Sequence, residues 1–189
     1  METIKNNLTK TWKGPVKEDF MKGVLIYERQ VQAVLYKYLI DWLPKSYEVW
    51  VEPVIYLEKY NLDKVKTDMV FCHGQKMIGV LELKFKPWEY IPFEGDLEKL
   101  SLFHTASQSE PSLALGYVPY SPIWENQLSN GKKLSYIIEK NLLKIMVTFG
   151  RPESGAFNLN NQKPPSNFFH LIGYFKSSDE FTFESKYYN

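Results

Sequence analysis

The chain has 189 residues, of which 44% are hydrophobic and 24% are charged, and its formal net charge is +1. This length suffices for one domain with a substantial core, and the charge excludes a strongly basic nucleic-acid-binding domain, although a local basic groove remains open. The single cysteine, Cys72, excludes a disulfide framework and a multi-cysteine zinc site, and it favours a reducing cytoplasm.

The N-terminal stretch METIKNNLTKTWKGP contains no apolar run, so the sequence predicts no signal peptide. The longest apolar stretches further along are interrupted by charged residues, as in VLIYERQVQAVLYKYLIDWL, so no transmembrane helix is expected. We therefore expect a soluble, cytoplasmic domain that has no membrane partner.

Helical periodicity predicts a first helix over roughly 16–43, ended by Pro44. Its expected buried stripe is apolar apart from one glutamate, and it contains Val24, Tyr27, Glu28, Val31, Val34, Leu35, Tyr38, Leu39 and Trp42. The next stretch, 47–57, is rich in β-branched and aromatic residues and predicts a strand. Pro53 within it indicates an edge position or a bulge.

Two further strands are expected over 65–74 and 75–85, with a hairpin turn at His73-Gly74-Gln75. The elements expected after them are a helix over 95–106, a strand over 112–118, a helix within 123–141 that is broken at Asn130-Gly131, a strand over 142–150, a polar loop over 151–167 and a last strand over 168–175. This order of elements indicates an α/β protein with a mixed β-sheet flanked by helices.

The apolar strand GVLELKFKP, residues 79–87, carries a carboxylate and an ammonium group two residues apart, Glu82 and Lys84, on one face. With the turn near 73–75, Asp68 faces residue 80 and lies diagonal to Glu82. Two carboxylates on neighbouring strands make an oxygen-rich site that suits Mg²⁺ or Mn²⁺. Lys84 would lie beside the ion, where it could orient or help deprotonate a water and stabilise charge on a phosphate. Glu28 could point to the same place.

Asp68, thirteen intervening residues and the run Glu82-Leu83-Lys84 resemble the signature of the PD-(D/E)xK nuclease superfamily. In that superfamily an acid on one strand is followed by acid-x-Lys on the next, and a preceding helix often carries a further glutamate, which Glu28 matches. The resemblance implies one nuclease-like domain over 1–189. Its restriction-endonuclease-like α-β-β-β-α-β core would span about 16–118, with a C-terminal elaboration over about 119–189.

The resemblance also implies an activity, a metal-dependent DNA phosphodiester hydrolase of the endonuclease type. Mg²⁺ or Mn²⁺ would be held by Asp68, Glu82 and the backbone carbonyl of Leu83. Lys84 would contact the attacking water, and Glu28 would position a second metal or a water. DNA is then the expected partner, and a homodimer is also allowed because many enzymes of this superfamily cut both strands as dimers.

Two polar residues are expected to support this site. Gln32 lies one turn after Glu28 on the first helix, and Lys99 lies on the helix that follows the acid-x-Lys strand. In several nuclease-like domains that helix adds a polar or basic residue to the site. Thr67 stands where the superfamily pattern commonly has proline, and this variation is frequent.

Simpler interpretations remain open for each residue. Glu82 and Lys84 could form an exposed ion pair worth about 0–1 kcal/mol, Asp68 could be a turn residue, and Glu28 could pair with Lys84. The whole chain could be a non-catalytic nuclease-like module that binds nucleic acid or a protein partner. The presence of Asp68, Glu82 and Lys84 together favours the nuclease, because a domain with no need for a metal has little reason to hold them together.

Overall fold

The computed structural model describes residues 1–57, 62–87, 94–108, 113–117, 134–150, 164–175 and 180–189. Its helices are α1 (Glu2–Thr11), α2 (Lys17–Met21), α3 (Glu28–Trp42) and α4 (Glu94–Gln108), and the π-helical turn η1 (Trp12–Val16) joins α1 to α2. Its strands are β1 (Tyr47–Val51), β2 (Val54–Leu57), β3 (Leu62–Lys66), β4 (Met69–His73), β5 (Lys76–Phe85), β6 (Leu113–Tyr117), β7 (Leu134–Gly150), β8 (Phe168–Phe175) and β9 (Phe181–Tyr188). None of these helices is both long enough and apolar enough to cross a membrane.

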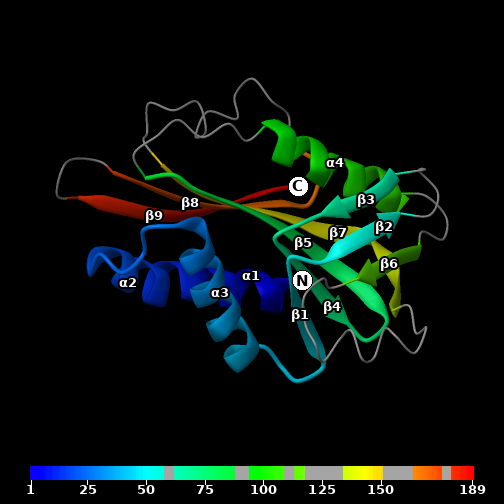
Figure 1. The fold of residues 1–189 in the computed structure, drawn as a ribbon, viewed down its shortest axis with the longest axis horizontal. Helices are drawn as coiled ribbons and strands as arrows, with labels where there is room; N and C mark the ends of the chain where they lie inside the picture. The colour runs from blue at the N-terminus through cyan, green and yellow to red at the C-terminus, as the bar shows by residue number, and fades with distance from the viewer. Residues whose placement is uncertain (58–61, 88–93, 109–112, 118–133, 151–163, 176–179) are drawn as a thin grey trace.

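The described strands form one mixed sheet in the order β1-β4-β5-β7-β6-β2-β3, with β8 beside β7 and β9 beside β8. The pairs β5–β7 and β7–β8 are parallel, and the other pairs are antiparallel. Helices α1, α2 and α3 lie on one side of the sheet and α4 lies on the other (Figure 1). The expected α/β class with a mixed sheet flanked by helices is confirmed.

The two faces of the sheet carry two separate apolar cores. Alternate residues of β7 face α1, α2 and α3, as expected from their spacing: Leu143, Ile145, Val147 and Phe149. Leu142 and Met146 point to the opposite face and pack in the core under α4. The acid-x-Lys strand β5 lies between β4 and β7, and side chains from its two faces pack in the two cores.

The expected helix over 16–43 is wrong as a single element, because α2 ends at Met21 and α3 begins only at Glu28. Gly23 has a φ of 70°, in the left-handed region that glycine adopts without strain, and this conformation ends the first helix. Val24 and Tyr27 therefore lie in the break and are 53% and 69% exposed, whereas they were expected to be buried. Glu28 becomes the first residue of α3. The helical segment before the break runs over 2–21, and the sequence pattern did not indicate its part over 2–15.

The strand expected over 47–57 is divided into β1 and β2 at Glu52 and Pro53, and the next expected strand is divided into β3 and β4 at Thr67 and Asp68. The two breaks lie side by side, since the Glu52 amide donates to the Asp68 carbonyl at 2.9 Å and the Thr67 amide donates to the Pro53 carbonyl at 3.4 Å. The interruption near Pro53 was expected as a bulge or an edge. Asp68 therefore lies in the short interruption between β3 and β4, immediately before β4.

The later elements agree in part with expectation. Helix α4 and strands β6 and β8 match the elements expected over 95–106, 112–118 and 168–175. Residues 134–141 were expected to be helical but belong to β7, and β9 follows the strand that was expected to be last. Apolar residues alternate along β7, as they do in a strand that is buried in a sheet. This packing outweighs the local helix propensity of the segment. The rest of the expected 123–141 helix and most of the 151–167 loop lie outside the described residues.

Close packing at Gly173 in β8 gives a test of the first core. A Cβ atom added there would lie 2.2 Å from Cδ2 of Phe149 and 3.0 Å from Cζ2 of Trp12. We expect Gly173→Ala to lower the free energy of unfolding by about 1–3 kcal/mol, because both rings are fully buried and must shift. Urea unfolding measures this, and Gly95→Ala in α4 is the control, since nothing lies within 4 Å of its added Cβ. Equal stability of the two variants would contradict this packing.

Candidate functional site

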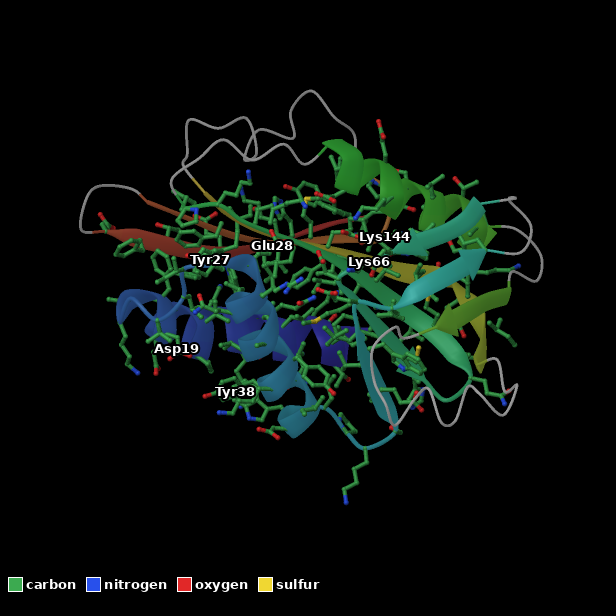
Figure 2. All side chains as sticks on the ribbon, viewed as in Figure 1. Asp19, Tyr27, Glu28, Tyr38, Lys66 and Lys144 are labelled. Carbon is green, nitrogen blue, oxygen red and sulfur yellow. The ribbon has the colours of Figure 1, made fainter. Side chains whose placement is uncertain are left out.

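Strand β5 continues past the end of β4, and the expected site residues meet at this open edge. The β4–β5 ladder ends at Leu81, whereas β5 runs on beside β7 as far as Phe85. The Leu83 amide donates to Oδ2 of Asp68 at 2.6 Å, and the Phe85 amide donates to Oε2 of Glu28 at 3.1 Å. Two carboxylates thus satisfy alternate amides of β5 that no described strand pairs on this side. Figure 2 shows Glu28 where the end of α3 meets the sheet.

The expected pairing of Asp68 with residue 80 is wrong. Met69 pairs with Leu81, and the same register brings Asp68 opposite Glu82 and not diagonal to it. The difference has two causes: the hairpin turn contains only two residues between the strands, and a β-bulge adds one residue to β5. The correction brings the two acids closer together than the sequence pattern predicted.

Glu82 is 1% exposed and lies on the face of β5 that α4 covers. Its Oε2 accepts a hydrogen bond from Nζ of Lys99 at 2.5 Å, while its Oε1 is buried and has no hydrogen-bond partner among the described residues. Burial raises the pKa of Glu82 to about 8, the charge of Asp68 adds to this increase, and Lys99 opposes it. A buried carboxyl oxygen without a hydrogen-bond partner is costly in free energy.

The other two acids respond to burial in the same direction. Burial raises the pKa of Asp68, and the hydrogen bond from the Leu83 amide offsets only part of the increase. Burial also raises the pKa of Glu28, which the amide of Phe85 and the charge of Lys84 partly counteract. All three carboxyl groups are therefore held in surroundings that disfavour their negative charge.

Asp96, near the start of α4, holds both lysines of the site. Its Oδ2 lies 3.3 Å from Nζ of Lys84 and its Oδ1 lies 3.2 Å from Nζ of Lys99, while Asp96 itself is 6% exposed. Burial alone would lower the pKa of Lys84, but the carboxylates of Asp96 and Glu28 outweigh burial and raise it. The pKa of Lys99 is raised too, because Glu82 and Asp96 outweigh burial. Both lysines are therefore ammonium ions, which donate hydrogen bonds and accept none.

The two expected support residues act in different ways. Lys99 contacts the carboxylate of Glu82 directly. Gln32 is buried, and its Nε2 donates to the backbone carbonyl of Asp68 at 3.0 Å. This hydrogen bond holds the backbone of Asp68 in position just before β4. Asp96 was not expected to be part of the site. The spacing Asp96-x-x-Lys99, on the helix after the acid-x-Lys strand, is the signal that could have identified it.

The donor atoms at this edge fit a divalent cation bound by two carboxylates and one carbonyl. In the described part of the chain, no three or more His, Cys, Asp or Glu side chains are grouped so that they could hold a metal. Asp68 and Glu82 supply two carboxylates, and the carbonyl of Leu83 leaves β5 at the same edge as its amide. Oxygen donors of this kind suit Mg²⁺ or Mn²⁺, with water completing the coordination. The oxygen of Glu82 that has no hydrogen-bond partner could serve as a ligand atom for such an ion.

Six charged side chains meet here from α3, the break before β4, β5 and α4: Glu28, Asp68, Glu82, Lys84, Asp96 and Lys99. The four carboxyl groups outnumber the two ammonium groups, and a cluster of buried acids with raised pKa values is a candidate functional site. Comparison of the chain with family models, with curated proteins and with solved structures finds no match, so the chemistry of this site has to be inferred from its own residues.

Proposed function

We propose that the chain is a metal-dependent DNA phosphodiester hydrolase of the endonuclease type, with a restriction-endonuclease-like core of the PD-(D/E)xK class. The observation that carries the proposal is the environment of Glu82, a buried carboxylate with one unpartnered oxygen beside the charge of Asp68. Holding two acids close together in dry surroundings costs free energy that a bound divalent cation would offset. Lys84, two residues after Glu82, adds a cation beside these acids.

Asp68, Glu82 and the carbonyl of Leu83 would hold Mg²⁺ or Mn²⁺. When bound, the ion would stabilise the negative charge that develops on the phosphate in the transition state. Lys84 donates hydrogen bonds to a phosphate oxygen or to the attacking water and so holds that water in line with the scissile bond.

Glu28 and Asp96 complete the arrangement. One oxygen of Glu28 accepts from the Phe85 amide, and its raised pKa makes the carboxylate a better proton acceptor than an ordinary glutamate, so it suits the positioning of a water. Asp96 keeps Lys84 in place. In the hydrolysis, the attacking water gives up a proton as its oxygen forms a bond to phosphorus, the bond from phosphorus to the leaving oxygen breaks, and the leaving oxygen takes up a proton from solvent water.

Cleavage of a panel of single-stranded, duplex and branched DNA by the purified protein in Mn²⁺ tests the proposal. We expect cleavage that is lost in chelator and in Asp68→Ala and Asp68→Asn. The asparagine keeps an oxygen that accepts from the Leu83 amide, so it separates the loss of charge from the loss of the hydrogen bond. The control is Glu139→Gln, which removes a carboxylate from a half-exposed ion pair with Lys76. Cleavage that persists in Asp68→Ala would contradict the assignment.

The ion pairs at the site favour a second candidate, a non-catalytic nuclease-like module that binds nucleic acid or a protein partner. Lys99 already occupies one oxygen of Glu82, and Asp96 binds both lysines, an arrangement that neutralises part of the charge without any ion. Titration of the protein with Mn²⁺, followed by electron paramagnetic resonance, separates the two candidates. The module predicts no Mn²⁺ binding that depends on Asp68, whereas the nuclease predicts binding that Asp68→Asn weakens.

A further inference from the structure

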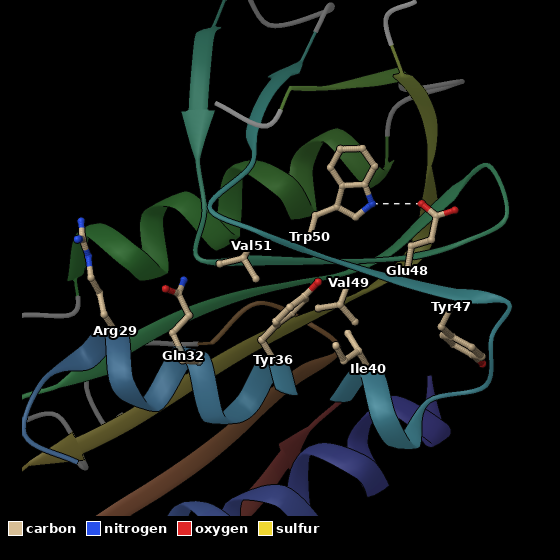
Figure 3. Close-up of a pocket in the computed structure, with 10 residues that line it drawn as sticks. Arg29, Gln32, Tyr36, Ile40, Tyr47, Glu48, Val49, Trp50 and Val51 are labelled. Atoms are coloured by element: carbon tan, nitrogen blue, oxygen red, sulfur yellow. Dashed lines mark hydrogen bonds between the residues drawn. The ribbon is translucent and has the colours of Figure 1, made fainter. Parts of the chain in front are cut away.

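A groove of about 590 Å³ runs between α3 and β1 (Figure 3). Residues three or four positions apart on α3 line one wall, as a single stripe of the helix: Arg29, Gln32, Ala33, Tyr36 and Ile40. The other wall is β1, which pairs only with β4 among the described strands and lies at an edge of the sheet. Alternate side chains of β1 face the helix across the groove, namely Tyr47, Val49 and Val51.

One end of this groove reaches the proposed active site. Gln32 lines the groove, and its Nε2 donates to the backbone carbonyl of Asp68 at 3.0 Å. Arg29, at the same end, is the residue after Glu28, whose carboxylate binds the Phe85 amide at the edge of β5. These contacts place one end of the groove next to Asp68 and Glu28, at the part of β5 that extends past β4.

The side chains along the groove combine one free cation with aromatic rings. Arg29 is exposed and makes no ion pair with any described residue. A guanidinium group binds phosphate oxygens in a bidentate way. Tyr36 is 36% exposed in the middle of the groove, whereas Tyr47, at the far end, is partly buried and its ring packs against that of His73 with 4.8 Å between the ring centroids (Figure 3). Unpaired bases stack on such rings, whereas paired bases are covered by their neighbours in the duplex.

We propose that this groove binds unpaired nucleotides of the DNA strand that is cut, with Arg29 on a phosphate and Tyr36 against a base. The inference rests on the proposed function and deepens it, because it makes the substrate class a DNA with a single-stranded segment beside the scissile bond. An extended peptide that pairs with the free edge of β1 is the rival occupant. The charge of Arg29 and the continuity of the groove with the acids favour the nucleic acid.

Fluorescence anisotropy with a labelled mixed-sequence oligonucleotide tests the groove directly, in chelator so that no cleavage competes with binding. We expect Tyr36→Ala to weaken binding of the single strand at least about fivefold without changing its salt dependence, because a stacking contact is lost. We expect Arg29→Gln to weaken binding and to reduce the slope of log K against log salt by about 0.7, the value for one phosphate contact on a single strand. The matched controls are Tyr187→Ala, a tyrosine that is 40% exposed on β9, and Lys37→Gln, an exposed cation of α3 outside the groove.

Three outcomes would overturn the inference. They are equal binding of the single strand by the wild type and both groove variants, equal binding of the single strand and its duplex, and no binding at all. Cleavage of the DNA panel in Mn²⁺ is measured separately, so cleavage with unaffected groove variants refutes the groove and leaves the nuclease standing. Loss of cleavage in Asp68→Asn with intact binding in the groove variants likewise refutes the groove alone. A wild type that neither binds nor cleaves any DNA refutes both proposals.

Discussion

Glu82→Gln is expected to abolish Mn²⁺ binding and to lower cleavage by roughly a hundred- to a thousandfold, while it makes the metal-free protein more stable at high pH. The two effects have one origin. Glu82 is buried with an unpartnered oxygen, so its negative charge is costly without a cation and necessary for holding one. Glutamine keeps the shape of the side chain and removes the charge. A residue that served only the fold would not give this combination of lost function and gained stability.

The direction of the pH effect follows from the raised pKa of Glu82. Its folded-state pKa is about 8, against an ordinary value of 4.5. The protonated carboxyl therefore stabilises the folded state fully below about pH 4.5, and this contribution is lost as the pH rises through 8. Each unit of pKa difference corresponds to about 1.4 kcal/mol, so the loss for the wild type amounts to a few kcal/mol.

Urea unfolding of the metal-free protein at pH 5 and at pH 9 measures the effect. The wild type is expected to lose stability between these values, and Glu82→Gln is expected to lose less, apart from the weakened contact with Lys99. Glu139→Gln, in its half-exposed ion pair, is expected to follow the wild type. Parallel losses in the wild type and Glu82→Gln would show that the buried carboxyl does not titrate as described.

Lys84→Met is expected to lower the rate of cleavage by roughly a hundred- to a thousandfold while Mn²⁺ binding is retained. The ammonium group of Lys84 is a hydrogen-bond donor held by Asp96, and methionine fills similar volume without donating. Removal of a positive charge next to two carboxylates makes the site more favourable for a cation. Loss of catalysis with undiminished metal binding therefore distinguishes a catalytic role for Lys84 from a role in the metal site.

Single-turnover cleavage and Mn²⁺ titration of Lys84→Met give the two quantities. The matched control is Lys76→Met. Lys76 is the first residue of β5, next to the hairpin turn and at the opposite end of the strand from the site, and it forms an ion pair with Glu139. We expect the loss in the single-turnover rate and little change in substrate affinity. Unchanged cleavage by Lys84→Met would limit Lys84 to its ion pair with Asp96 and would refute its catalytic role.

The parts of the site that follow local spacing were accessible from the sequence. Glu82 and Lys84 share one face of β5 because side chains of a strand alternate, and this rule needs no knowledge of the rest of the fold. The position of Asp68 required the hairpin register, which a β-bulge and a two-residue turn changed in a way that the amino-acid pattern does not specify. Glu28 was expected within a long helix, whereas Gly23 interrupts that helix and makes Glu28 the first residue of α3.

The parts that depend on how distant elements pack could not be predicted. Asp96 contacts Lys84 only because α4 lies across this end of β5, and no local pattern gives the placement of a helix on a sheet. The contact of Gln32 with the carbonyl of Asp68 depends in the same way on the angle at which α3 meets the break before β4. Pro53 indicated an edge position for β1 as one of two possibilities, but the groove also depends on the packing of α3 beside that edge, which the sequence does not specify.

The overhang of β5 beyond β4 has a consequence for solubility. An uncovered run of strand amides is a template on which a second chain can add a strand, and such edges lead to aggregation unless something blocks them. Asp68 and Glu28 occupy the amides of Leu83 and Phe85, and their charges repel an incoming backbone carbonyl. The same two acids that the proposed chemistry needs therefore block the addition of a strand at this end of β5.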